Sequence, residues 1–187
     1  MDEGDYRARI ELGRNITLAF EYVQQVFRET AQLMRQLDDL MGADWRPTYG
    51  NRTTKEVTSH LGYPRHWLVR ASFRIYDSQK DPGLRKGITV TYWGSGIEQP
   101  LLIGGRMDYI VHDEEGTLKD DHWDLWSAWF QEGSEDKRVD GTIYPVIPEQ
   151  SVLKDHVREA RVFAIPLVSI ESEEDIRTKV YDRLMAL

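Results

Sequence analysis

The chain has no cysteine among its 187 residues. This absence excludes disulfide bonds, thiolate metal sites and cysteine nucleophiles, and it fits a reducing compartment. No run of residues approaches the roughly 18 consecutive apolar positions that a membrane-spanning helix requires. The opening stretch, MDEGDYRARIELGRN, is charged and lacks the apolar region of a signal peptide. We therefore expect a cytoplasmic protein that does not interact with a membrane.

Sequence motifs that would identify an enzyme are scarce. The chain has no phosphate-binding P-loop, no glycine-rich dinucleotide motif after a strand, no HExxH zinc pair and no EF-hand loop. Ser95 stands between two glycines in WGSGIE, but the full nucleophile-elbow pattern is missing and no helix is predicted after it. No stretch indicates a particular protein family. The sequence therefore favours a non-catalytic protein.

The net charge of −8 is distributed unevenly along the chain. Residues 1–45 contain five Lys or Arg and nine Asp or Glu, whereas residues 107–187 contain nine and 19. Residues 46–106 have the opposite balance, with ten Lys or Arg and four Asp or Glu. The whole chain should repel polyanions at long range, yet its middle third predicts a basic patch. Two interpretations are open. The segments neutralise each other in the fold, or the basic third attracts a nucleic acid or an anionic small molecule.

The clearest predicted element is a long amphipathic helix over residues 14–42. Apolar residues recur every three or four positions, which is the period of a helix with one wide apolar face. Asn15 is the expected N-cap and Gly42 the expected end. Such a face predicts burial against a sheet, or against a second copy of the helix. Its main row is Ile16, Phe20, Val23, Phe27, Thr30, Met34, Leu37 and Met41.

The rest of the chain predicts an antiparallel sheet. Residues 66–130 alternate between apolar and polar side chains, a period of two that predicts a four-strand meander. Residues 131–160 are polar and irregular, with a short helix before the final strand. Residues 161–187 are expected to form that strand and a helix with Ser172 as its N-cap. The predicted fold is α+β, a single domain over residues 1–187. Its mainly antiparallel five-stranded sheet carries the long N-terminal helix and the C-terminal helix on one face.

The predicted binding surface is the polar face of this sheet, where arginines alternate with aromatic side chains. Arg70 and Arg74 lie four apart on one strand, so both should project from the same side. Arg, Trp and Tyr are enriched at the centres of protein interfaces, and the same groups bind phosphates and stack on bases. The alternative is that a helix covers this face, or that its charges pair across strands. The predicted members are Arg70, Arg74, Tyr76, Trp93, Arg106, Asp108, Asp124 and Trp126.

The stretch HDEEGTLKDDH, residues 112–122, is the candidate metal site. His112 and His122 flank the tip of a predicted hairpin, and Asp113 lies beside the first of them. Imidazole and carboxylate groups are suitable ligands for zinc, manganese or iron. The alternative is a charged hairpin tip that only keeps the turn solvated. We expect the protein to have no cofactor. The alternative is a divalent metal bound by these residues.

These observations favour a non-catalytic binding or accessory subunit. It would hold a protein partner, or a second copy of itself, through the Arg/Trp sheet face or through the long helix. One alternative is a metal-dependent hydrolase or nuclease centred on residues 108–124. Another is a sensor of a small anionic ligand such as a nucleotide, bound through the basic middle third.

Overall fold

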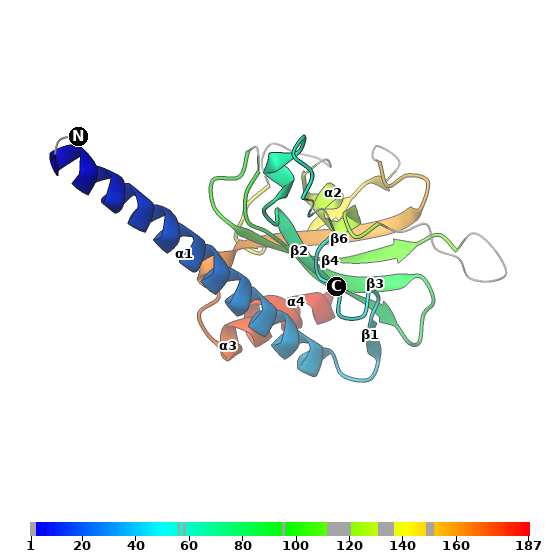
Figure 1. Cartoon of the computed structure of the whole chain (residues 1–187). Coiled ribbons are helices and arrows are strands. Elements are labelled where there is room, and N and C mark those ends of the chain that lie inside the picture. The colour runs from blue at the N-terminus through cyan, green and yellow to red at the C-terminus, as the bar shows by residue number, and fades with distance from the viewer. Residues whose placement is uncertain are drawn as a thin grey trace. The chain divides into compact units, whose positions relative to one another are not determined.

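The chain forms two compact units, described in a computed structural model (Figure 1). The first unit ends at Gln36 and consists, over its described residues, of a single helix. The second unit spans Leu37–Leu187 and contains the sheet and the remaining helices. The structure describes residues 3–55, 57, 59–94, 96–111, 121–130, 137–148 and 152–187, and of their side chains those from residue 9 onward.

Within the described residues the helices and strands form an α+β fold, as predicted. In chain order they are α1 (Glu3–Met41), β1 (Trp45–Pro47), a 3-10 turn (Pro64–His66), β2 (Ala71–Ser78), β3 (Leu84–Thr91), β4 (Leu101–Tyr109), α2 (Asp124–Phe130), β5 (Tyr144–Val146), β6 (Val157–Pro166), a second 3-10 turn (Leu167–Ser169), α3 (Glu173–Asp175), a π-helical segment (Ile176–Tyr181) and α4 (Asp182–Ala186).

Helix α1 is confirmed, but it is longer than predicted. It begins at Glu3, so the predicted start at Asn15 was wrong. The residues before Asn15 include Glu, Arg, Ala and Leu, which are good helix formers, and they outweigh the capping preference of a single asparagine. The predicted end is confirmed, because Gly42 has a φ of 66°. This left-handed backbone conformation ends helices and is readily adopted by glycine.

The sheet has six strands in the order β1-β2-β3-β4-β6-β5, and every neighbouring pair is antiparallel. The antiparallel sheet is confirmed, with one strand more than the five predicted. The two edge strands, β1 and β5, are short, and each contains a proline, Pro47 and Pro145. Proline has no N–H to donate, so it is tolerated at a sheet edge where no further strand pairs.

The predicted fourth strand of the meander is a helix. Residues 124–130 form α2, and the place beside β4 that this strand was predicted to take is occupied by β6. Leu125, Ala128 and Trp129 are all buried, and their spacing of three and four places them on one side of a helix. A stretch of seven residues is too short for periodicity alone to separate this pattern from alternation.

The short helix expected before the final strand is also absent from its described residues. Residues 152–156 form turns, and β6 begins at Val157. Val157 already pairs with Tyr109 at the end of β4. Residues with some local helix propensity therefore form part of strand β6, because they pair with β4.

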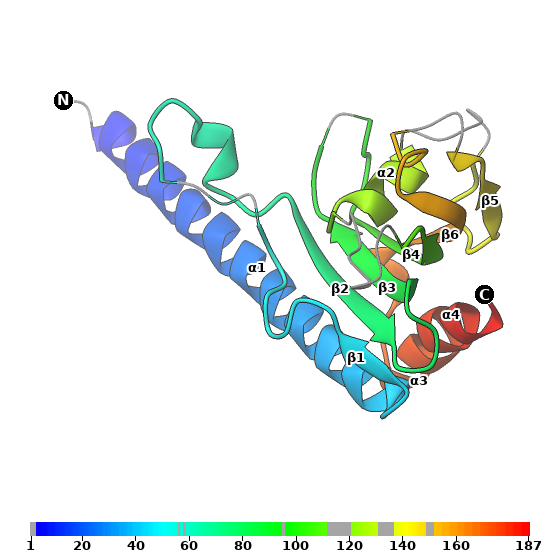
Figure 2. The same ribbon diagram turned by 90° about the vertical axis from the view of Figure 1, so that its right-hand side faces the viewer.

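The second unit has a layer of helix on each face of its sheet (Figure 2). Adjacent glycines on β4 show the arrangement, because successive side chains point to opposite faces. A Cβ atom on Gly105 would stand 2.5 Å from Leu125 of α2, and one on Gly104 would collide with the ring of Phe163. The cation of Arg183, on α4, lies over that Phe163 ring, 6.0 Å from its centroid. Helix α2 thus covers one face and the C-terminal helix covers the other.

The C-terminal helix forms as predicted at its start. The Ser172 hydroxyl accepts a hydrogen bond from the backbone N–H of Asp175 at 3.1 Å, which satisfies a free donor of the first turn. Ile176, Val180 and Leu184 are buried, as their four-residue spacing predicts. In the described part of the chain, no helix combines the length and the apolar composition needed to cross a membrane.

Candidate functional site

Four of the eight residues predicted to form one binding face do share a face. Tyr76 pairs with Lys86, and Lys86 pairs with Arg106, so these side chains form one row across the sheet. Arg74 and Asp108 have the same parity on their own strands. The C-terminal helix contacts this row at Lys86 and Arg106. The face predicted as a binding surface is therefore largely a helix-covered one.

The other four residues lie elsewhere, which corrects the prediction of a single face. The Arg70 guanidinium lies over the ring of Trp126 on α2, with Cζ 4.8 Å from the centroid. Asp124 is buried in the first turn of α2. Trp93 lies beyond the end of β3, and its Nε1 donates to the Val69 carbonyl at 3.0 Å. Arg70 directly precedes β2, and its side chain contacts α2 instead of following the parity of the strand.

Arg74 and Tyr76 belong to a polar cluster around Asp38. The Arg74 guanidinium donates from Nε to Asp38 Oδ1 at 2.7 Å and from Nη2 to Oδ2 at 2.6 Å, and it also donates to the Gly50 carbonyl. The Tyr76 hydroxyl donates to Asp38 Oδ1 at 2.8 Å. Burial, followed by the negative charge of Asp38, raises the pKa of Tyr76 far above its usual value. This cluster satisfies its own charges and joins the end of α1 to β2.

Lys86 and Arg106 face the end of the C-terminal helix. Lys86 Nζ lies 3.4 Å from the Met185 carbonyl oxygen, and Arg106 Nη1 donates to the Leu187 oxygen at 3.1 Å. Basic groups suit this position, because the last carbonyls of a helix have no partner within it and carry partial negative charge. Burial, and then the nearby charge of Arg106, lowers the pKa of Lys86. These two cations therefore face the C-terminal helix rather than present a basic surface.

Asp124 is the centre of a second buried polar cluster. Its carboxylate accepts from the Tyr109 hydroxyl at 2.8 Å and from the backbone N–H of Asp121 at 2.9 Å. His156 Nε2 lies 3.2 Å from the other carboxylate oxygen. Burial and the charge of Asp124 raise the pKa of Tyr109 well above its usual value. The cluster joins α2, β4 and the turn before β6.

Only one of the three predicted metal ligands can be located. His112 and Asp113 lie outside the described residues. The His122 ring is buried against Phe73, with ring centroids 4.8 Å apart, and its Nδ1 contacts the Asp121 carboxylate. Over the described ranges, no group of three histidine or acidic side chains is placed to hold a metal ion. The metal site stays a prediction that depends on residues 112–120.

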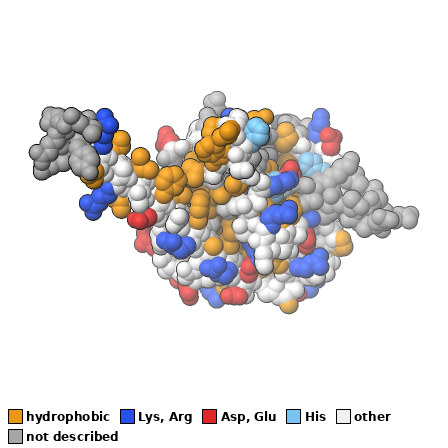
Figure 3. All heavy atoms as spheres, in the orientation of Figure 1, with side chains coloured by type: hydrophobic (Ala, Val, Ile, Leu, Met, Phe, Trp, Pro, Cys, Tyr) orange, Lys and Arg blue, Asp and Glu red, His pale blue; other side chains and the backbone are white. Residues whose placement is uncertain are grey.

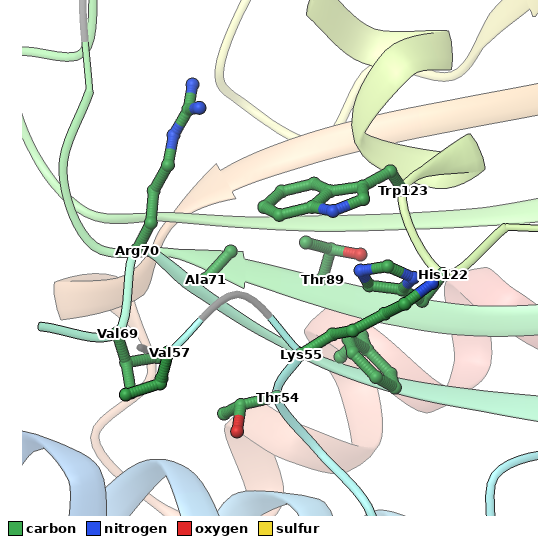
Figure 4. Close-up of a pocket in the computed structure, with 10 residues that line it drawn as sticks. Thr54, Lys55, Val57, Val69, Arg70, Ala71, Thr89, His122 and Trp123 are labelled. Atoms are coloured by element: carbon green, nitrogen blue, oxygen red, sulfur yellow. The ribbon is translucent and has the colours of Figure 1, made fainter. Parts of the chain in front are cut away.

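The described part of the second unit has a pocket between β2, β3 and the start of α2 (Figure 4). We call it the Arg70 pocket. In Figure 4, Arg70 and His122 stand on opposite sides, with Ala71 and Thr89 between them. The cavity volume is about 10 Å³, which is the space that one water molecule needs. Its walls include Lys55, Arg70, Phe73, Thr89, His122 and Trp123.

Buried polar atoms without a hydrogen-bond partner surround this pocket. Two of them, Nε of Arg70 and Oγ1 of Thr89, belong to residues of the pocket wall. A third is Nε1 of Trp126, whose ring lies under the Arg70 guanidinium. Oγ1 of Thr91 is a further one, and Thr91 pairs with Ala71 in the pocket wall. Most buried polar groups in proteins have a partner, so a group of such atoms at one place suggests a site for a bound molecule.

Sequence reasoning did not select Thr89 or His122 as members of one pocket. The available signal was the alternating Thr-x-Thr pattern of GITVTYW. Alternation alone places Thr89 on the polar face of its strand, whereas in the structure Thr89 pairs with Phe73 and shares the core face covered by α2. The register between β2 and β3 decides this, and a single-strand pattern contains no information about register.

The second candidate surface is the apolar side of α1 in the first unit. Leu12, Ile16 and Phe20 follow each other four residues apart and are 61%, 52% and 55% exposed. They lie on one side of the helix, and Val23 and Phe27 continue the row. Figure 3 shows hydrophobic side chains gathered along this helix. We call this row the α1 stripe.

The two surfaces differ in what they offer chemically. The Arg70 pocket offers hydrogen-bond donors around a small cavity, and the α1 stripe offers apolar area for a protein.

Comparison of the chain with protein-family models, curated proteins and solved structures found no match to any of them.

Proposed function

We propose that this protein is a non-catalytic binding subunit that holds a protein partner through its long N-terminal helix. The observation that supports this most is the α1 stripe, in which Leu12, Ile16 and Phe20 each leave more than half of their surface exposed. Contiguous apolar surface of this kind is typical of protein interaction sites. A single helix also has no core of its own in which to bury such a row.

The partner that the stripe fits best is a second copy of the same helix. Ile16, Phe20, Val23 and Phe27 are spaced by four, three and four residues, which is the spacing of a helix-pairing seam. Residues 9–36 contain four arginines and three glutamates. Because these positive and negative charges nearly balance, two copies of the helix do not repel each other strongly.

The Arg/Trp sheet face supports the proposal less. Its members Arg74, Tyr76 and Arg106 are occupied by Asp38 and by the C-terminal helix. A binding role for that face would require these internal contacts to break. The helix needs no such rearrangement. We place the protein in the cytoplasm as part of the same proposal, since a chain with no cysteine suits a reducing compartment.

The test is the oligomeric state of the full chain in solution. We expect sedimentation equilibrium to show a dimer, and a double variant Ile16→Lys/Phe20→Lys to be monomeric, because two buried cations without partners oppose pairing. The matched control is Gln25→Lys/Gln32→Lys, which adds the same charge on the opposite side of the helix and should leave the dimer intact. A wild-type chain that remains monomeric at high concentration would contradict the proposal.

A further inference from the structure

The Arg70 pocket carries an inference that is independent of the helix. Thr89 is 1% exposed, lines the pocket, and its hydroxyl has no hydrogen-bond partner. The side chain is held by β3, whose pairing with β2 and β4 leaves it little freedom to turn away. A buried hydroxyl in this position is satisfied when a bound group supplies an acceptor or donor.

The surrounding groups favour an acceptor. The unpartnered Nε of Arg70 and Nε1 of Trp126 are both N–H donors that cannot accept a hydrogen bond. Among the described residues no carboxylate pairs with Arg70, and its guanidinium contacts the rings of Trp123 and Trp126 instead, at 5.8 and 4.8 Å. Lys55 adds a second cation at the pocket, with its Nζ 4.0 Å from the Asp121 carboxylate.

We propose that the Arg70 pocket binds one oxyanion group, a carboxylate or a phosphate, of a small anionic molecule. One oxygen of the group accepts from the Thr89 hydroxyl inside the pocket, and the positive charge of Arg70 attracts the anion. The cavity of about 10 Å³ has room for one such oxygen. The rest of the ligand lies outside the cavity, so the pocket recognises a group and does not enclose a whole nucleotide.

The aromatic side chains provide a direct readout. Trp123 and Trp126 both contact Arg70, so an anion that binds there changes the environment of two indole rings. We would titrate the full chain with sodium phosphate and, separately, with sodium acetate, and follow tryptophan fluorescence and the thermal midpoint. Sodium chloride at the same ionic strength is the reference. A saturable response to phosphate alone assigns the phosphate class, and one to acetate alone assigns the carboxylate class.

Two variants decide whether the response comes from this pocket. Thr89→Val keeps the shape of the side chain and removes the hydroxyl, and Arg70→Gln removes the charge. Each should weaken binding by about tenfold or more, as expected for the loss of one hydrogen bond to a charged group. Arg161→Gln is the matched control, because Arg161 is exposed and pairs only with Glu159 across the described residues; it should bind as the wild type does.

If Arg70→Gln does not fold, Arg70→Met replaces it, since methionine also removes the positive charge and keeps an apolar side chain against the two tryptophan rings. Either variant binding as tightly as the wild type overturns the proposal. So does a response to both oxyanions that is no larger than the response to chloride. In that case the pocket contains water alone.

Discussion

Arg74 and Asp38, which are 36 residues apart in the chain, form a two-point ion pair with N–O distances of 2.7 and 2.6 Å. The Arg74 side chain is 9% exposed and that of Asp38 is 30% exposed. The pair connects the end of α1 to β2, and it uses the arginine that sequence parity had assigned to a binding surface.

Removing the carboxylate of Asp38 should destabilise the second unit. Asp38→Ala removes both carboxylate contacts of the buried Arg74 guanidinium, which keeps its hydrogen bond to the Gly50 carbonyl. We expect a loss of about 2–3 kcal/mol in the free energy of unfolding, less than for a fully buried pair because Asp38 is partly exposed. Urea denaturation measures this as a lower midpoint with an unchanged slope. Asp39→Ala, at the exposed neighbouring position, is the control. Equal midpoints for the two variants would contradict the prediction.

Tyr76 should make stability fall at alkaline pH. Its raised pKa means that the folded protein holds the phenolic proton more tightly than the unfolded chain does. The resulting contribution is fully present below the unfolded pKa of about 10 and is lost as pH rises above it. Tyr76→Phe should therefore flatten part of the alkaline decline, and the remainder should come from Tyr109, whose pKa is also raised.

The alkaline experiment has a control in Tyr63→Phe. Tyr63 is 56% exposed, so its substitution should leave the decline above pH 10 unchanged. The measurement is the free energy of unfolding from denaturant titrations between pH 8 and pH 11, values chosen to bracket a phenolic pKa of about 10. A wild-type chain whose stability stays constant over this range would refute the role assigned to Tyr76.

Lys86 should destabilise the folded state at neutral pH. Its pKa is lowered from 10.5 by burial and by Arg106, so the unfolded chain binds the proton more tightly than the folded protein. The stability contribution of this lysine therefore rises as pH increases toward 10.5 and is least favourable below its folded pKa. We expect Lys86→Met to unfold at higher denaturant concentration than the wild type at pH 7.

The difference between Lys86→Met and the wild type should shrink as pH rises toward 10.5. Comparing the two proteins at each pH cancels the tyrosine effect, which both contain. Lys154→Met, at an exposed position, is the matched control and should show no such pH dependence. A difference that is constant from pH 7 to pH 10 would count against a buried, charged Lys86.

Asp124 should be needed for the junction between α2, β4 and β6. Asp124→Ala removes the acceptor for the Tyr109 hydroxyl and for the Asp121 N–H. The expected cost is about 2–4 kcal/mol, because buried donors are left without partners. Asp155→Ala, at an exposed position beside His156, is the control. Thermal unfolding followed by near-UV circular dichroism would report the loss through the tryptophans of α2, and equal midpoints would contradict it.

Patterns inside single elements were predicted well from the sequence. The strands β2 and β3, the glycine that ends α1 and the serine that caps the C-terminal helix all appear in the structure. Each of these depends on a few neighbouring residues and on backbone geometry, so a short window contains the needed information. Helix α2 was not predicted, because a stretch of seven residues fits both the helical period and the strand period.

Relations between elements were not predictable in the same way. Thr89 faces the core because it pairs with Phe73, and Arg70 contacts Trp126, which is 56 residues later in the chain. The partner of Arg74 is on a different element, at Asp38. A shift of register by one residue would reverse every such assignment, and the register is set by turns and by long-range pairing.

The sequence by itself therefore determined the types of most long elements and some of their ends, such as Gly42 after α1, because local propensity and hydrophobic period are properties of consecutive residues. Tertiary structure decided which polar side chains are satisfied internally and which ones surround a pocket without partners. Those outcomes depend on the distances between residues that are far apart in the chain, such as Arg70 and Trp126. Only the pairing of strands and the packing of α2 bring such residues together.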